Sequence, residues 1–102
     1  RIYIVEDDLS VINILEDIIE NYDLGEICGD CGGDVPDISH ILRCQPDVVL
    51  VDFLMPVMDG VQLVSEIRKY NSNIKFIIKS FNLSLTLFAM CCFICLLIRL
   101  LV

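Results

Sequence analysis

Basic residues are scarce in this chain of 102 residues, which has 7 Lys and Arg against 15 Asp and Glu and a net charge of -8. Proteins that bind nucleic acid directly need clustered Lys and Arg to contact the phosphate backbone. The composition therefore argues against a nucleic-acid-binding surface on this segment. An acidic surface suits a site that gathers a divalent cation.

The start of the chain lacks the features of a secretory signal. Arg1 is followed at once by a short apolar run and then by acids, and there is no initiator Met. We therefore expect a cytoplasmic protein whose sequence is a fragment or a processed product. A chain of this length has room for one domain with one modest core.

Cysteine is plentiful, with 6 residues, but nothing indicates an oxidising compartment in which they would form a disulfide framework. Cys28 and Cys31 form a CxxC pair, whereas Cys91, Cys92 and Cys95 lie in an apolar run, where Cys acts as a small hydrophobe. A zinc site would need thiolates that converge from distant segments. Zinc or redox chemistry is therefore a minor alternative.

Short apolar runs predict the strands of a parallel sheet. Residues 2–5 and 48–51 are continuous apolar runs, of the kind buried on both faces of such a sheet, and each runs directly into acids. Residues 75–80 predict another strand. Residues 26–28 predict a weak edge strand, followed by a flexible glycine-rich turn at 29–33.

Helical patterns alternate with these strands. Residues 11–22 carry an apolar stripe, with Asp8 placed to cap the helix, and residues 61–70 repeat the pattern. The stripe of the first helix consists of Val11, Leu15, Ile18 and Tyr22, widened by Ile12 and Ile19.

A short helix marked by Ile38, Ile41 and Leu42 ends before Pro46, and His40 falls on its polar side, where we expect a solvated residue. The alternation predicts an α/β fold with a doubly wound parallel sheet of order 2-1-3-4-5 and right-handed crossovers.

One stretch combines these signals with chemistry. Asp52 ends a buried strand, where open α/β sheets place reactive groups, with Pro56 four residues and Gly60 eight residues further on. With its sequence Asp-Phe-Leu-Met-Pro and the following Met-Asp-Gly, this stretch closely resembles the phosphoacceptor loop of receiver domains of two-component response regulators. Also similar to that family are the acids Glu6 and Asp7 and the hydroxyl of Ser80, 28 residues after Asp52.

The resemblance implies a flavodoxin-like (CheY-like) fold and a role for each matching residue. Asp52 would be the phosphoacceptor, and Asp7 and Asp52 would ligate Mg²⁺, with Glu6 helping directly or through water. The main-chain carbonyl of Leu54 would complete the protein ligands, and Ser80 would be the switch hydroxyl. The phosphoryl group would come from a histidine kinase or a histidine phosphotransfer protein. Such a chain catalyses its own phosphorylation and is a switch rather than a turnover enzyme.

The resemblance covers residues 1–80, which would form an incomplete receiver domain. Phe81 stands where the family usually has a small residue, and no Lys follows Lys79, so the family's active-site lysine is absent. We therefore expect the fifth strand and last helix to be missing or replaced by an apolar helix in a tail, residues 81–102.

Residues 83–102 are apolar nearly throughout and, as a helix, would be long enough for a bilayer core. They could be a membrane anchor, a divergent buried helix, or a non-native end from a frame error or truncated gene, and we favour the last.

Two alternatives compete with an active receiver. Loss of the lysine and the bulk of Phe81 also suit a degenerate pseudo-receiver, a binding module that the tail could anchor to a membrane. A phosphatase of the haloacid dehalogenase type also uses a strand-end Asp. That family has a second Asp two residues later, where this chain has Leu54, so we set it aside.

Overall fold

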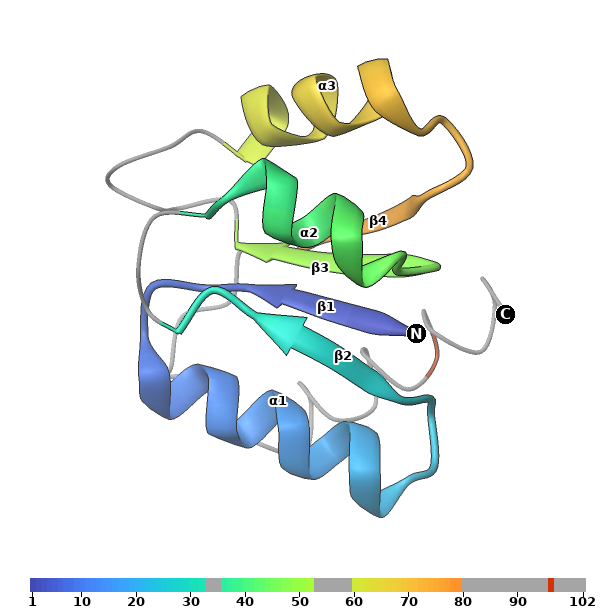
Figure 1. The fold of residues 1–102 in the computed structure, drawn as a ribbon. Helices are drawn as coiled ribbons and strands as arrows, with labels where there is room; N and C mark the ends of the chain where they lie inside the picture. Colours follow the sequence, from blue (N-terminus) through green and yellow to red (C-terminus); the bar gives the residue numbers. More distant parts are fainter. Residues whose placement is uncertain (33–35, 53–59, 80–95, 97–102) are drawn as a thin grey trace.

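The structure, a computed structural model, describes residues 1–32, 36–52, 60–79 and 96. Four parallel strands form one sheet in the order β2-β1-β3-β4. Helix α1 covers one face, and α2 and α3 cover the other (Figure 1). This confirms the predicted α/β arrangement of order 2-1-3-4, and none of the described residues forms a fifth strand. The elements are β1 (Ile2–Val5), α1 (Leu9–Asn21), β2 (Ile27–Asp30), α2 (Ile38–Cys44), β3 (Val48–Asp52), α3 (Gly60–Tyr70) and β4 (Lys75–Lys79).

Strands β1 and β3 lie at the centre of the sheet, and every residue in both is buried. Their apolar residues alternate between the two faces: Ile4 packs in the cluster under α1, and Tyr3 packs in the cluster under α2 and α3. Both faces are covered by helices, which is why these strands are continuous apolar runs. Val5 of β1 pairs with Val51 of β3, and this register positions the polar residues that follow.

Helix α1 packs through the predicted stripe and begins at the predicted cap. The Oδ1 atom of Asp8 accepts a hydrogen bond from the backbone N–H of Ser10 at 2.9 Å. Tyr22, which was expected in the stripe, is 51% exposed, because the helix ends at Asn21 and Tyr22 is its C-cap. The buried residues of the helix are Val11, Ile12, Leu15, Ile18 and Ile19.

Strand β2 extends further than the sequence predicts. The turn expected from residue 29 onward begins later, because Gly29 and Asp30 belong to β2 and pair with Tyr3 and Ile4 of β1. The register shifts between Ile2 and Tyr3, which leaves Cys28 as an extra residue at a bulge. A Cβ atom at position 29 would lie 3.0 Å from Cε2 of Tyr3, so glycine permits the close approach of the two strands.

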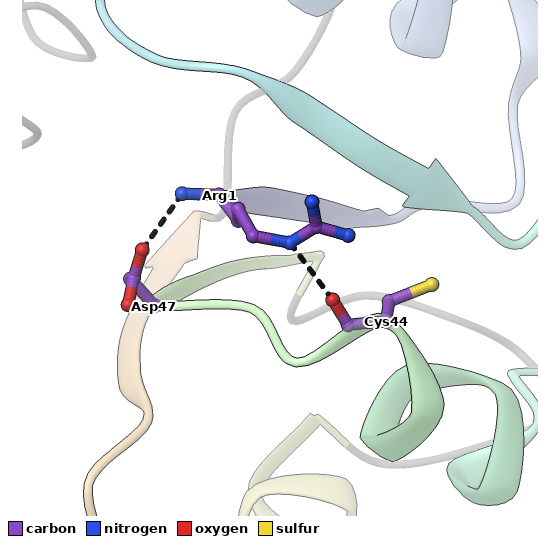
Figure 2. A network of polar contacts seen from close by, with 3 residues as sticks. All are labelled: Arg1, Cys44 and Asp47. Atoms are coloured by element: carbon purple, nitrogen blue, oxygen red, sulfur yellow. Dashed lines mark hydrogen bonds and ion pairs between the residues drawn. The ribbon is translucent and has the colours of Figure 1, made fainter.

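Arg1 connects β1 to the junction between α2 and β3. Its Nε donates to the carbonyl of Cys44 at 3.0 Å, and its amino group pairs with Oδ2 of Asp47 at 2.8 Å (Figure 2). The N–H groups of Asp47 and Val48 donate to the carbonyl of Arg1 at 2.8 and 3.2 Å. Carbonyls at the end of a helix lack partners inside it, so the Arg1 side chain satisfies one of those of α2. These contacts fix the position of Cys44 relative to β1.

Within the described part of the chain, no helix is long and apolar enough to cross a membrane. The expectations for the tail fall on residues 81–102, of which the structure describes residue 96 alone.

Candidate functional site

Carboxylates from two adjacent strand ends lie together at one edge of the sheet. Asp52 is the last residue of β3, and Glu6 and Asp7 directly follow β1. One carboxylate oxygen from each residue lies within 4.8 Å of the other two. The carboxyl ends of parallel strands share an edge, and the in-register pairing of β1 and β3 brings these three side chains to the same part of it.

The three carboxylates differ in their access to water. Glu6 is 3% exposed and Asp52 is 9% exposed, whereas Asp7 is exposed. Negative charges this close, two of them largely removed from water, repel one another unless a cation lies among them. An all-oxygen donor set with one exposed member suits a hard divalent cation that keeps part of its water shell, as Mg²⁺ does. The residues present therefore fit such an ion.

Hydrogen bonds hold Glu6 in place at the end of β1. Its Oε1 atom accepts from the N–H of Asp8 at 3.2 Å. The N–H of Glu6 donates to Sγ of Cys31 at 3.3 Å, and this thiol donates to the carbonyl of Glu6 at 3.0 Å. Cys31, half of the CxxC pair, thus binds the backbone of a site residue. Sequence reasoning missed this role because no local pattern marks a partner 25 residues away.

Two other residues of the predicted site, Leu54 and Ser80, lie outside the described residues. The described backbone reaches Lys79, which is the register partner of Asp52 in the pairing of β3 with β4.

His40 differs from its predicted environment. It was expected to be solvated, but it is half-buried, and its Nδ1 atom lies 2.8 Å from the hydroxyl of Tyr3. The two rings meet edge to face with their centroids 5.5 Å apart. The polar side of the short helix α2 faces the hydroxyl of a buried tyrosine, which the sequence of the helix does not reveal.

A doubly wound parallel sheet with carboxylates at the carboxyl edge of its central strands defines an α/β protein with an acidic cluster at the edge where such folds bind ligands. Comparison with known families is more specific: residues 2–91 match the response regulator receiver domain. The chain therefore belongs to the response regulator receiver domain family. The match extends beyond residue 80, where the motif resemblance ends. Receiver domains act in two-component signalling with a partner kinase, and the cluster of Glu6, Asp7 and Asp52 fits the phosphorylation pocket of such a domain.

Similar proteins support the assignment. The chain is 39% identical over 69 residues to the transcriptional regulatory protein GlnL of Bacillus subtilis, covering 67% of this chain and 22% of GlnL. It is 31% identical over 80 residues to the chemotaxis protein CheY of Thermotoga maritima, covering 78% of this chain and 66% of CheY. The solved structure of the anti-anti-sigma factor PhyR from Bartonella quintana shares the fold, with a TM-score of 0.61 and 20% identity, over 76% of this chain and 31% of PhyR. The chain thus spans only part of each of these proteins.

Proposed function

We propose that this chain accepts a phosphoryl group on Asp52 and acts as a signalling switch. The observation that carries the proposal is the convergence of Asp52 with Glu6 and Asp7, their oxygens within 4.8 Å, in a member of the receiver family. The donor would be a histidine kinase or a histidine phosphotransfer protein. The chain would catalyse its own phosphorylation and would not convert a separate substrate to product.

The chemistry follows from an Asp carboxylate that acts as a nucleophile towards phosphorus. An oxygen of Asp52 forms a bond to phosphorus while the bond from phosphorus to the donor histidine nitrogen breaks, and that nitrogen keeps the electron pair. Because β3 pairs with β1 on one side and β4 on the other, the backbone of Asp52 is held in a fixed position for this attack.

A bound Mg²⁺ would reduce the repulsion between the carboxylate and the phosphoryl oxygens. Glu6, Asp7, Asp52 and the main-chain carbonyl of Leu54 would hold the ion. The hydroxyl of Ser80 would bond to the phosphoryl group, and this local electrostatic change would bias the following loop. We assign these roles to an incomplete receiver of residues 1–80 with an atypical apolar tail, residues 81–102.

The direct test is the intact mass of the chain after incubation with acetyl phosphate and Mg²⁺. We expect the mass to increase by one phosphoryl group, in an adduct that base removes, and we expect no adduct on an Asp52→Asn variant. An Asp23→Asn variant is the matched control, because Asp23 is an exposed acid outside the cluster and asparagine tolerates its positive φ of 50°. An adduct that survives Asp52→Asn would contradict the assignment.

A degenerate pseudo-receiver is the second candidate, favoured by Phe81 in place of a small residue after Ser80. In that case a folded sample would bind Mg²⁺ through Glu6, Asp7 and Asp52 but gain no mass from acetyl phosphate. Isothermal titration with Mg²⁺ on the same preparation separates the two candidates. Binding with an adduct supports the active receiver, and binding without one supports the pseudo-receiver.

A further inference from the structure

Away from the acidic cluster, two thiols and one imidazole lie together between β1, β2 and α2. His40 and Cys44 are four residues apart on α2, and Nε2 of His40 lies 3.8 Å from Sγ of Cys44. The Cys44 thiol also donates to the carbonyl oxygen of Cys28 in β2, at 3.5 Å, so its single proton points either to that carbonyl or to Nε2 of His40. All three residues are half-buried.

The hydrogen bonds around Tyr3 determine which nitrogen of His40 carries the proton. The Tyr3 hydroxyl lies 3.1 Å from the carbonyl oxygen of Asp30 and 2.8 Å from Nδ1 of His40. A carbonyl only accepts, so the single hydroxyl proton must point to Asp30 if both contacts are hydrogen bonds. Nδ1 of His40 then carries the proton and donates to Tyr3. The bare nitrogen is Nε2, which faces the thiol of Cys44.

This arrangement is that of an activated nucleophile. A thiol beside the unprotonated nitrogen of an imidazole, whose other nitrogen is held by a third group, has a base to which it can transfer its proton. The hydroxyl of Tyr3 is the third group, and the contact from Arg1 to the Cys44 carbonyl fixes the backbone of the thiol. The thiolate is the reactive form of cysteine towards oxidants.

The bulge in β2 provides a second thiol nearby. A Cβ built at Gly29 would point towards Tyr3 and Cys44, and it would lie 3.3 Å from Sγ of Cys44. Cys28 packs against the same cluster under α2, so two successive residues of the bulge turn to one face. Burial and then the neighbouring Cys44 raise the pKa of the Cys28 thiol. Cys31, by contrast, is hydrogen-bonded to the backbone of Glu6.

We propose that Cys44 is a peroxide-reactive thiol that forms a disulfide with Cys28 and so links α2 to β2. His40 takes the proton of Cys44, and the sulfur attacks one oxygen of hydrogen peroxide. The O–O bond breaks, and the leaving hydroxide receives that proton as water, which leaves a sulfenic acid. The sulfur of Cys28 then attacks the sulfur of Cys44, and the S–O bond breaks. The second hydroxide leaves with the Cys28 proton as water. Two thiols lose two electrons, and one peroxide gains them.

The test treats the full chain with hydrogen peroxide, blocks remaining thiols with iodoacetamide and maps tryptic peptides without reductant. Trypsin cuts after Arg43 and Arg68, so a Cys28–Cys44 disulfide joins residues 2–43 to residues 44–68. We expect this joined pair as the main product. Cys31 is in the same peptide as Cys28, so Cys31→Ser is the matched control and must still give the joined pair.

A Cys28→Ser variant identifies the nucleophile, because it leaves Cys44 without its resolving partner. Dimedone, which traps sulfenic acids, should then label Cys44. A His40→Gln variant keeps a polar side chain but removes the base, and we expect the rate of Cys44 oxidation to fall about tenfold or more, towards the hundredfold that a positioned base can contribute. Tyr3→Phe should also lower the rate of Cys44 oxidation, because it removes the hydroxyl that keeps the proton of His40 on Nδ1.

Three results would overturn the proposal. They are a disulfide within residues 2–43, oxidation of Cys44 no faster than that of Cys31, and an unchanged rate in His40→Gln. Circular dichroism of each variant before treatment shows whether it is folded. If a variant is unfolded, dimedone labelling of the parent chain at short times decides the matter: Cys44 must be labelled before Cys31. None of these readouts depends on phosphorylation of Asp52.

Discussion

Val5 of β1 and Val51 of β3 are register partners, so Glu6 and Asp52 leave the sheet at neighbouring positions. The parallel strands carry both carboxylates to the same edge, and only 3% of Glu6 and 9% of Asp52 remain exposed there. Pairing of the strands therefore holds the two carboxylates close together despite their repulsion. The cost of this repulsion should be measurable as a change in the free energy of unfolding when one carboxylate is removed.

Without divalent cations, Asp52→Asn should raise the free energy of unfolding by about 1–2 kcal/mol, because it removes one of the crowded charges while keeping its shape. Addition of Mg²⁺ should stabilise the parent more than the variant, since the ion binds the folded carboxylates. Urea unfolding with and without Mg²⁺ measures both effects. Asp23→Asn, at an exposed site outside the cluster, should change neither the free energy of unfolding nor its increase with Mg²⁺. Equal Mg²⁺ stabilisation of the parent and of Asp52→Asn would count against a cation site here.

The stability of the chain should also depend on the ionisation of Glu16 in α1. Burial, followed by a hydrogen bond with the Asp30 side chain, raises the pKa of Glu16 above its ordinary value of 4.5. A raised pKa means that the folded state holds the proton more tightly than the unfolded state, so this contribution to stability is present below pH 4.5 and is lost as the pH rises through the raised pKa.

Glu16→Gln should therefore flatten the decline in stability above pH 4.5 and leave the variant more stable than the parent at neutral pH. The comparison is made by urea unfolding at several pH values from about 4 to about 8, which runs from the ordinary pKa of a carboxyl group to well above it. Glu26→Gln changes an exposed acid next to β2 and serves as the control. Parallel pH profiles for the parent and Glu16→Gln would show that the Glu16–Asp30 contact does not control this dependence.

Replacement of Gly29 by Ala should destabilise the chain by about 1–3 kcal/mol, the usual cost of overpacking. The new Cβ would lie 3.0 Å from Cε2 in the ring of Tyr3, which is fully buried. Gly25→Ala is a matched comparison, because its Cβ would lie 3.0 Å from Cδ1 of Ile2, the flexible end of a side chain. Thermal unfolding should rank Gly29→Ala well below Gly25→Ala, and the reverse order would contradict the packing described for the bulge.

Tyr3→Phe should lower the free energy of unfolding by about 1–3 kcal/mol, because the carbonyl of Asp30 and Nδ1 of His40 would both lose a partly buried hydrogen-bond partner. Burial raises the pKa of this hydroxyl well above its ordinary value of 10.0, so it stays a hydrogen-bond donor throughout the physiological range. Chemical unfolding of Tyr3→Phe measures the cost. Tyr70→Phe, which alters an exposed tyrosine, should have little effect.

Much of the fold could be predicted because its signals are local. The apolar runs of β1 and β3 have no polar face, so they indicate a central position in a parallel sheet, and the acids directly after them must share its carboxyl edge. The apolar stripe of α1 likewise predicts which side of the helix is buried. These patterns, with the family resemblance, were enough to bring Glu6, Asp7 and Asp52 together.

The contacts that could not be predicted are long-range. Gly29 belongs to a glycine-rich stretch that is typical of a turn. The ring of Tyr3 on the neighbouring strand explains why a glycine lies within β2. His40 is on the polar side of a short helix, and its partner is 37 residues away. The link from Cys31 to the backbone of Glu6 depends on where β2 ends relative to β1, which side-chain periodicity does not determine.

The central position of β1 also sets the order in which the molecule can assemble during synthesis. Ile2 pairs with Ile27 on one side and with Val48 on the other, so β1 has no complete pair of neighbours until β3 has been synthesised. Until then β1 is an exposed apolar segment that chaperones can recognise. Asp52 joins the acids of β1 only when β3 docks, so cation binding by the three carboxylates can begin only after β3 has paired with β1. A fluorescent divalent-cation probe on stalled nascent chains would therefore report the chain length at which β3 docks beside β1.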